Sequence, residues 1–327
     1  MPLILTEHEI RSVLNMSDLI EAMQAALIEY SEGRTQQPLR TVLEVGVQKA
    51  FFGLMPAFVP GSSALGTKLV TVYGSNAARG LPTHLATIVM LDPTTGAPIA
   101  FLDGRYITEA RTGAVSAVST RWLAKTDAAT LAIIGTGVQA RSHLEAIATV
   151  RTLRVIKVWS PNPDHRESFV NEMRELAQPA DLRAVASAAE AVSGADIIVL
   201  ATASRTPVIH NEWVSEGAHI CAVGACRPDQ REMDGALVAR ARLFVDSRTG
   251  ALAEAGDIVL AVREGLITAN HIAGELGEVA GRHLDARRDS REVTLFKSLG
   301  MAVEDVAAAH LACARAKERG LGRTISF

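Results

Sequence analysis

The pattern of apolar and polar residues differs between the first and the second part of the chain. From residue 130 onward, short apolar runs that suit buried strands alternate with stretches of helical periodicity. The expected strands are 131–134, 155–159, 197–201, 220–223 and 243–245, and the helices between them include 166–177 and 186–192. Because strands and helices alternate, the second part of the chain is predicted to form a doubly wound parallel sheet.

The first part of the chain has a different pattern. Thr6 and Glu9 have the spacing of a capping box, and a second helix should begin near 17–18 and stop near Gly33. A long helix rich in small residues is expected at 106–124. Strand-like segments separated by turns rich in Gly, Pro, Asn and Asp lie between these helices, at 40–45, 67–73, 85–91 and 98–102. This succession predicts an α+β domain with a mixed or antiparallel sheet.

A glycine-rich turn, G-T-G-V-Q-A at 135–140, joins the first strand of the second part to the helix after it. The first glycine allows a tight turn, the second lets the backbone approach a pyrophosphate, and the small Ala140 lets the helix pack close to the strand. The helix N-terminus adds free N–H groups and a partial positive charge. We therefore predict a Rossmann-type dinucleotide site, with a glycine turn that binds no nucleotide as the alternative. The predicted cofactor contacts are Gly135, Thr136, Gly137, Val138, Gln139 and Ala140, with Thr202 and Ser204 after a later strand.

The residues after the second strand of such a fold distinguish the two nicotinamide dinucleotides. An acidic residue at the end of that strand binds the ribose 2′-hydroxyl of NAD. Here the strand at 155–159 is followed by Ser160 and Asn162, with Arg166 nearby, so no carboxylate occupies the strand end. NADP(H) is therefore the preferred cofactor. NAD(H) is the alternative, if Asp164 bends back to the ribose.

The last part of the chain has a helical pattern. After Arg291 we expect one helix over 292–319, which returns to the first domain because the nucleotide fold is already complete. The predicted fold class is therefore α/β, with a Rossmann-type NAD(P)-binding domain at 125–296. Residues 1–124 and 297–327 are expected to form the α+β domain.

The composition is that of a globular enzyme. Of the 327 residues, 48% are hydrophobic and 21% charged, and the formal net charge is −3. A nucleic-acid partner would need a concentrated basic face, which these interspersed charges do not provide. The three cysteines suggest neither a disulfide framework nor a metal site, so we expect no metal and a cytoplasmic location. No apolar run approaches the roughly 18 to 20 residues that span a bilayer, so no membrane partner is expected.

Three cations of the first domain are candidates for ligand binding. Lys68 opens an otherwise apolar strand, Arg111 lies within the helix of small residues, and Arg40 is the first residue of the strand-like segment 40–45. A guanidinium group on such a surface usually needs a buried or ligand anion as its partner. The alternative for each is a solvated face, where most charged side chains lie.

Several segments of the chain resemble one known family. They are T-K-L-V-T-V-Y at 67–73, G-L-P-T-H at 80–84, the run at 101–118, I-G-T-G-V-Q-A at 134–140 and L-F-K-S-L-G-M-A-V-E-D at 295–305. On these segments the chain is identified as a member of the ornithine cyclodeaminase/mu-crystallin family, with matches in order over nearly its whole length. The resemblance implies that the α+β domain binds the substrate and forms a homodimer through its sheet.

The same resemblance assigns the substrate site. Members of the family bind an α-amino or α-imino acid beside the nicotinamide, and the matching positions here imply that Arg40, Lys68 and Arg111 hold its carboxylate. Thr83 falls in the loop near the site. The chemistry agrees, because a small carboxylate needs a bidentate guanidinium or an ammonium group to replace its water.

Two departures from the cyclodeaminase pattern favour another branch of the family. Gly53 stands where cyclodeaminases carry a glutamate, and Cys226 where they carry an aspartate that engages the amine. A diamine would lack two charged partners, each worth about 1.5–3 kcal/mol, so ornithine should bind poorly. The R-P-D loop at 227–229 and the Thr83-His84 pair resemble instead the ketimine-reductase branch, which reduces Δ1-pyrroline-2-carboxylate and Δ1-piperideine-2-carboxylate to L-proline and L-pipecolate.

The expected function is thus NAD(P)H-dependent reduction of a cyclic imino acid. Lys68 or a bound water supplies the imine proton, Asp229 stabilises the iminium or is a turn residue after Pro228, and His84 relays a proton or is structural. Two other enzymatic activities remain open: ornithine cyclodeamination and oxidation of an acyclic amino acid such as L-alanine. A non-catalytic protein that binds NADPH or a small ligand is the alternative of another class.

Overall fold

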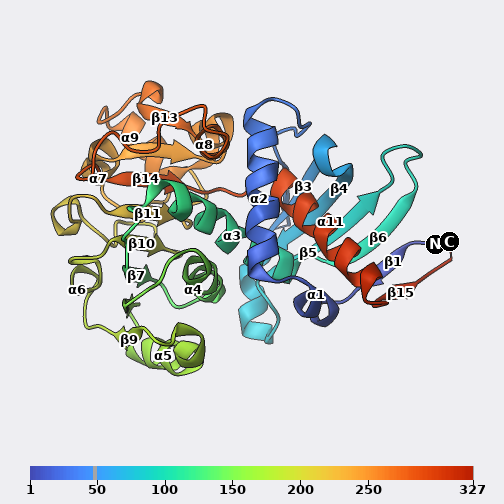
Figure 1. The fold of residues 1–327 in the computed structure, drawn as a ribbon, viewed down its shortest axis with the longest axis horizontal. Coiled ribbons are helices and arrows are strands. Elements are labelled where there is room, and N and C mark those ends of the chain that lie inside the picture. Colours follow the sequence, from blue (N-terminus) through green and yellow to red (C-terminus); the bar gives the residue numbers. More distant parts are fainter. Residues whose placement is uncertain (47–49, 327) are drawn as a thin grey trace. The chain divides into compact units, whose positions relative to one another are not determined.

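The computed structural model describes residues 1–46 and 50–326 (Figure 1). The chain divides into two compact units, Met1–Arg111 with Gly300–Phe327, and Thr112–Leu299. The division falls inside helix α3 (Arg105–Leu123), so one helix contributes residues to both units. The boundaries predicted from the sequence between the substrate-binding and the cofactor-binding domain, at 124/125 and 296/297, stay a prediction.

The first unit contains a seven-stranded sheet in the order β15-β1-β6-β5-β4-β3-β2. β1 pairs with β6 in parallel, and the other pairs are antiparallel, so the predicted mixed sheet is confirmed. The sequence did not predict β3, because Gly53 and Pro56 interrupt its apolar run, and such residues are rare inside strands. The strands are β1 (Leu3–Leu5), β2 (Thr41–Val45), β3 (Ala50–Val59), β4 (Ala64–Val72), β5 (His84–Leu91), β6 (Pro98–Asp103) and β15 (Arg323–Thr324).

Among the described residues, three α-helices belong wholly to this unit. α1 (Glu7–Val13) begins with the predicted capping box between Thr6 and Glu9. α2 (Met16–Ser31) is capped by Asn15, one residue earlier than expected from the sequence, and ends just before Gly33. α11 (Ala302–Glu318) packs against α2, β3 and β4, as Figure 1 shows, so the last helix does return to the first unit.

The helix predicted over 292–319 is wrong in its first third. Residues 294–297 form strand β14 (Thr294–Lys297), and the helix begins only at Ala302. The strand forms because β11 and β12 flank it in parallel and satisfy its backbone groups on both sides. Gly300, with φ +79°, then turns the chain into α11.

The second unit contains an eight-stranded sheet in the order β13-β12-β14-β11-β10-β7-β8-β9, and its described strand pairs are parallel. The predicted doubly wound sheet is confirmed, although β9 and β13 were not expected. The strands are β7 (Thr130–Ile134), β8 (Val155–Trp159), β9 (Asp181–Ala184), β10 (Ile197–Leu200), β11 (His219–Ala222), β12 (Arg242–Val245), β13 (Ile272–Glu275) and β14. The helices are α4 (Val138–Val150), α5 (Pro163–Ala177), α6 (Ala188–Val192), α7 (Gly235–Arg240), α8 (Arg248–Glu254), α9 (Gly256–Arg263) and α10 (Leu276–Ala280).

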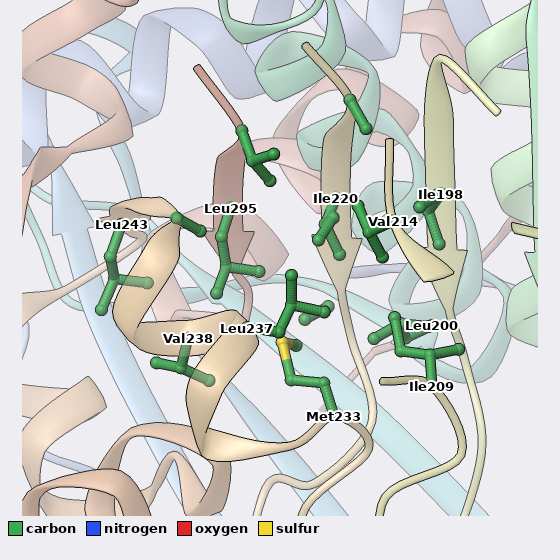
Figure 2. Packing of buried hydrophobic residues seen from close by; sticks show 14 of the residues in the cluster. Ile198, Leu200, Ile209, Val214, Ile220, Met233, Leu237, Val238, Leu243 and Leu295 are labelled. Carbon is green, nitrogen blue, oxygen red and sulfur yellow. The ribbon is translucent and has the colours of Figure 1, made fainter. Parts of the chain in front are cut away.

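Apolar side chains cover both faces of this parallel sheet, which is why its strands read as nearly continuous apolar runs. Figure 2 shows part of the cluster on one face, where strand residues such as Ile220 and Leu295 pack with Met233 and Leu237. The other face packs against α4 and α5 through Leu144, Ile147 and Phe169.

Small residues let α3 approach α4 closely. A Cβ on Gly113 would lie 2.5 Å from the Oγ of Ser142, so a larger side chain does not fit there. Ser116 Oγ is 2.8 Å from His143 Nε2, and the same ring contacts the Gln139 carbonyl at 2.6 Å through Nδ1. Burial lowers the pKa of His143 to about 4, so the ring is neutral and structural. No helix in the described part of the chain is long and apolar enough to cross a membrane.

Candidate active site

Lys68 and Arg111 meet at the start of α11. The Nζ of Lys68, in β4, lies 2.5 Å from Asp305 Oδ2. Arg111, in α3, donates through Nε to Asp305 Oδ1 at 2.9 Å and through Nη1 to Glu304 Oε2 at 2.7 Å. Lys68 and Arg111 are only 2% and 4% exposed, and both carboxylates are fully buried. The carboxylates occupy the first turn of α11, where the helix dipole favours negative charge.

Gly300 brings Arg40 to the same place. Its carbonyl accepts a hydrogen bond from Arg40 Nη2 at 3.1 Å. A Cβ on Gly300 would overlap the guanidinium group of Arg111, and its φ of +79° is also unfavourable for other residues. The structure therefore gathers the three predicted cations, Arg40, Lys68 and Arg111, within the first unit.

The electrostatics of this cluster suit an anionic ligand. Its three cations, Arg40, Lys68 and Arg111, lie beside two buried carboxylates, Glu304 and Asp305. Burial, which Asp305 opposes and which Arg111 and Arg40 reinforce, lowers the pKa of Lys68 to about 8. Burial raises the pKa of Asp305, but Arg111 and Lys68 outweigh burial and keep that pKa below its ordinary value.

Sequence reasoning assigned no role to Gly300, Glu304 or Asp305. The last two fell inside the helix predicted over 292–319, where a charged pair is usually solvated. One signal was available: Glu304 and Asp305 are the only charged residues in the segment 298–309, whose other residues are nearly all apolar or small and therefore typical of a helix packed on several sides.

Thr83 and His84 lie farther along the β4–β5 hairpin. Their side chains contact each other, with Thr83 Oγ1 3.0 Å from His84 Nδ1. His84 pairs with Val72, which is four residues from Lys68 in β4, or roughly 13 Å along the strand. The pair is therefore not adjacent to the cation cluster in the hairpin.

The glycine turn has the geometry of a phosphate-binding loop. Gly135 has φ +119°, and a Cβ there would overlap the Ala201 carbonyl oxygen, so the tight turn needs glycine. Gly137 caps α4, and no atom lies within 4 Å of the position that its Cβ would take. Ala140 is fully buried against the sheet, whereas Val138 is 55% exposed. This open backbone at the start of a 13-residue helix fits the diphosphate of a dinucleotide.

The other predicted cofactor residues lie at the same edge of the sheet. The chain passes from β7 to β8 on one side and later to β10 on the other, which makes the β7/β10 boundary a topological switch point. Ligands of doubly wound sheets bind at the carboxyl ends of the strands beside such a point. The residues that follow β7, β8 and β10 there are Gly135 to Ala140, Ser160 and Asn162, and Thr202 and Ser204.

The segment after β8 carries no carboxylate at the strand end. Ser160 is buried and its Oγ donates to the Asn162 carbonyl at 3.2 Å. Asn162 caps α5 by accepting from the backbone N–H of Asp164 at 2.9 Å. Arg166 donates to the carbonyl of Val185 at 2.9 Å and to that of Ala186 at 3.2 Å. The guanidinium group of Arg166 is thus held by backbone in this structure.

The loop after β11 contains Cys226 and Asp229. Cys226 is exposed, and its thiol lies 3.3 Å from the Val223 carbonyl. Asp229 is exposed in a turn that the Gln230 N–H closes on the Arg227 carbonyl at 3.2 Å, which is the geometry expected of a turn residue. Among the described residues, no group of three or more His, Cys, Asp and Glu side chains is placed to hold a metal ion.

Comparison with known proteins gives consistent matches over the whole chain. The model of the ornithine cyclodeaminase/mu-crystallin family matches residues 1–320. Ketimine reductase mu-crystallin of Rattus norvegicus is 40% identical over 314 residues, which cover 95% of this chain and 96% of the relative.

Two solved structures are similar throughout. Δ1-Pyrroline-2-carboxylate reductase of Thermococcus litoralis, in complex with NADH and L-proline, has a TM-score of 0.95 and 40% identity, covering 99% of this chain and 100% of that one. An archaeal alanine dehydrogenase dimer with bound NAD has a TM-score of 0.94 and 33% identity, covering 100% of this chain and 99% of that one.

Proposed function

Because the chain belongs to the ornithine cyclodeaminase/mu-crystallin family, we propose that it is an NAD(P)H-dependent reductase of cyclic ketimine carboxylates. Its substrates are Δ1-pyrroline-2-carboxylate, reduced to L-proline, and Δ1-piperideine-2-carboxylate, reduced to L-pipecolate. The observation that carries the proposal is the cluster of Arg40 with the buried Lys68 and Arg111, which brings three cationic side chains together beside Gly300, Glu304 and Asp305. The NADH and L-proline bound to the Thermococcus litoralis relative support the choice of a cyclic imino acid.

In the proposed mechanism, the three cations bind the ring carboxylate and orient the C=N bond. A guanidinium group offers two parallel N–H donors to a carboxylate, and an ammonium group adds a compact charge. Glu304 and Asp305 fix the side chains of Arg111 and Lys68, so little rotational freedom is lost when the substrate binds. Fixed orientation of this kind supplies a large share of the rate acceleration in hydride transfers.

Lys68 is also the proposed proton source. Its pKa of about 8 lets the ammonium form exist at neutral pH and still release a proton to the imine nitrogen. When bound, the reduced nicotinamide supplies the hydride that adds to the C=N carbon. Asp229 is the second proposed catalytic residue, as a carboxylate that stabilises the iminium, and Thr83 and His84 complete the proposed substrate contacts.

The cofactor is held, in this proposal, by the turn from Gly135 to Ala140 with Thr202 and Ser204 at the neighbouring strand end. NADP(H) is preferred, because Ser160, Asn162 and Arg166 surround the strand end without a carboxylate. NAD(H) is the alternative, since the two similar solved structures contain NADH and NAD.

The proposed assembly is a homodimer that uses the sheet of the first unit. All five residues of the edge strand β2 are exposed, including Val42 and Leu43 at 49% and 52%. An exposed apolar edge is usually paired or covered in a native protein. The dimer of the similar alanine dehydrogenase supports this assignment. The cysteines, which are all free, support a reducing, cytoplasmic environment.

Oxidation of an acyclic amino acid is the second candidate. The alanine dehydrogenase match favours it, and the same cations would bind any α-amino acid carboxylate. Ornithine cyclodeamination is less well supported. Gly53 pairs with Val70, two residues from Lys68, so the carboxylate that a diamine would need on this part of the sheet is missing. A non-catalytic binding protein would not need a lysine whose pKa is close to neutral.

One panel of assays separates these candidates. Oxidation of NADPH or NADH is followed with each cyclic imine, with pyruvate plus ammonia, and in the reverse direction with L-alanine or ornithine and NAD(P). The proposal expects turnover to be fastest with a cyclic imine. Faster turnover of pyruvate with ammonia would support the alanine dehydrogenase, and tight NADPH binding with no turnover of any substrate would support the binding protein.

A further inference from the structure

A second cluster of buried charges lies in the second unit, and the mechanism proposed above gives its side chains no role. Lys297, at the end of β14, is fully buried. Its Nζ lies 3.0 Å from Asp257 Oδ2, at the start of α9, and donates to the carbonyl of Gly224. Glu232, also fully buried, completes the cluster, which we call the Glu232 cluster: Glu232, Asp257 and Lys297.

Glu232 connects two loops at the carboxyl edge of the sheet. Its Oε1 accepts a hydrogen bond from the backbone N–H of Thr202, after β10, at 2.6 Å. Its own backbone N–H, in the loop after β11, donates to Asp257 Oδ1 at 2.8 Å. Lys297 binds the beginning of the same loop through Gly224. The cluster thus ties the segments that follow β10, β11 and β14 to one another.

Backbone and side chains pack closely around Gly224 and Gly256 at this edge of the sheet. A Cβ on Gly224 would lie 2.5 Å from Glu232 Oε2 and would also overlap the Thr202 carbonyl oxygen. A Cβ on Gly256 would overlap the carbonyl oxygens of Arg227 and Gln230, so the turn that contains Asp229 rests directly on α9. Displacement of the Glu232 side chain must therefore move backbone in both loops.

The Oε2 atom of Glu232 is buried and has no hydrogen-bond partner among the described residues. It and the Thr202 carbonyl oxygen, two acceptors, crowd the same position beside Gly224. A proton on Oε2 would remove the negative charge that no donor stabilises at this buried atom.

The charges that face Glu232 favour this protonated form. Lys297 is the cation of the cluster, Asp257 is a second carboxylate, and Cys226 faces Lys297 from the loop. Arg231, the nearest other cation on the loop, is paired with Glu264. Burial raises the pKa of Glu232 to about 7; Lys297 opposes this shift and Asp257 adds to it.

We infer that Glu232 is a positioning residue, which holds the loops after β10 and β11 together most firmly when its carboxyl group is protonated. The inference deepens the proposed function and rests on it in one respect, because Thr202 and Asp229 on these loops are the proposed cofactor and substrate contacts. Loss of the proton leaves a surplus negative charge in the cluster and loosens both loops. Such loosening would lower the affinity for dinucleotide and substrate in alkaline solution.

The backbone N–H of Thr202 provides a direct readout of the loops, because it exchanges with solvent only when its hydrogen bond to Glu232 Oε1 opens. Its rate of hydrogen–deuterium exchange is measured in wild type and in Glu232→Gln, whose amide imitates the protonated acid at every pH. Taking the ratio of the two rates at each pH cancels the intrinsic pH dependence of the exchange.

We expect the ratio of wild-type to Glu232→Gln rates to rise about tenfold between about pH 6 and about pH 8, because the proton is bound with a pKa of about 7 in the closed loop and 4.5 in an open one. The matched control is Glu175→Gln, the same change on the exposed face of α5, whose ratio to wild type should stay constant. A ratio for Glu232→Gln that does not change with pH would overturn the inference.

A second measurement needs no variant. The infrared carbonyl band of a protonated buried carboxylic acid should be present in wild type at about pH 6 and should disappear as the pH rises through about 7. Absence of this band at acidic pH would also overturn the inference. Both measurements use the protein without cofactor or substrate. If the protein reduces no imine but the ratio of wild-type to Glu232→Gln rates still rises with pH, the proposed function is refuted and the positioning role of Glu232 is supported.

Discussion

Replacement of Asp305 by asparagine tests the cation cluster most directly. Asp305 binds Lys68 through one carboxylate oxygen and Arg111 through the other, at 2.5 and 2.9 Å. Each charged hydrogen bond of this kind is worth about 1.5–3 kcal/mol. The amide keeps the shape of the side chain but removes its negative charge, so Lys68 and Arg111 lose the carboxylate that they share.

The expected loss follows from these magnitudes. If about 3 kcal/mol of the lost interaction serves to orient the substrate, kcat/KM for a cyclic imine falls by roughly 100-fold or more. The pH profile should also change. Asp305 raises the pKa of Lys68, which is about 8 in wild type, so its removal lowers that pKa. The alkaline limb of kcat/KM should therefore move to lower pH in Asp305→Asn.

Glu304→Gln is the matched control. It removes a carboxylate that contacts Arg111 but leaves the partner of Lys68 in place. We expect a loss of activity with an alkaline limb close to that of wild type. Initial rates of nicotinamide oxidation across the pH range, with circular dichroism to verify folding, provide the comparison. A folded Asp305→Asn enzyme with wild-type kcat/KM and an unchanged limb would refute the reasoning.

Four further predictions concern stability and cofactor binding. Gly137→Ala should fold normally, because no atom lies near its added Cβ. It should nevertheless bind dinucleotide at least several-fold more weakly in a fluorescence titration, and an unchanged affinity would contradict the assignment of this turn to the diphosphate. Ser160→Asp should lower the ratio of kcat/KM with NADPH to kcat/KM with NADH by about tenfold or more, since a carboxylate then occupies the end of β8. A constant ratio would contradict the proposed 2′-phosphate site. Gly300→Ala should lower the free energy of unfolding by about 1–3 kcal/mol in urea and reduce substrate affinity, because its φ is positive and its Cβ would meet Arg111; wild-type stability would contradict this. The free energy of unfolding of wild type should fall relative to that of Glu232→Gln, by up to about 3 kcal/mol, as the pH rises from about 4.5 through about 7. The reason is that the folded state binds the Glu232 proton more tightly than the unfolded state does. Curves of unfolding free energy against pH that run parallel for the two proteins would contradict this prediction.

The repeating part of the fold was predictable from the sequence. Strands β7 and β10 are buried on both faces and consist almost wholly of apolar residues, so their runs stand out, and β8 contains one charged residue in an otherwise apolar run. β14 was mistaken for helix because T-L-F-K is short and precedes a strongly helical segment. Only its place between β11 and β12 determines that it is a strand, and pairing between distant segments leaves no local pattern.

The candidate site was predictable only in part. Arg40, Lys68 and Arg111 attracted attention because charged residues are unusual in apolar or small-residue surroundings. Their carboxylate partners and Gly300 did not, because the sequence does not reveal which distant segment neutralises a buried charge. The same holds for Glu232 and Lys297, which are 65 positions apart in the numbering but share one buried cluster.

The source of these partners has a consequence for how the protein is made. Arg40 and its acceptor Gly300 are separated by 260 residues, and Arg111 and Asp305 by 194, with the entire second unit inserted between them. During synthesis on the ribosome, the inserted unit emerges complete while the cations of the first unit still lack the anions that compensate their burial. The first unit can therefore close only after the ribosome has released the last helix. A nascent chain stalled before residue 300 would expose an unfinished sheet, in which Lys68 and Arg111 lack their carboxylate partners, to chaperones and proteases.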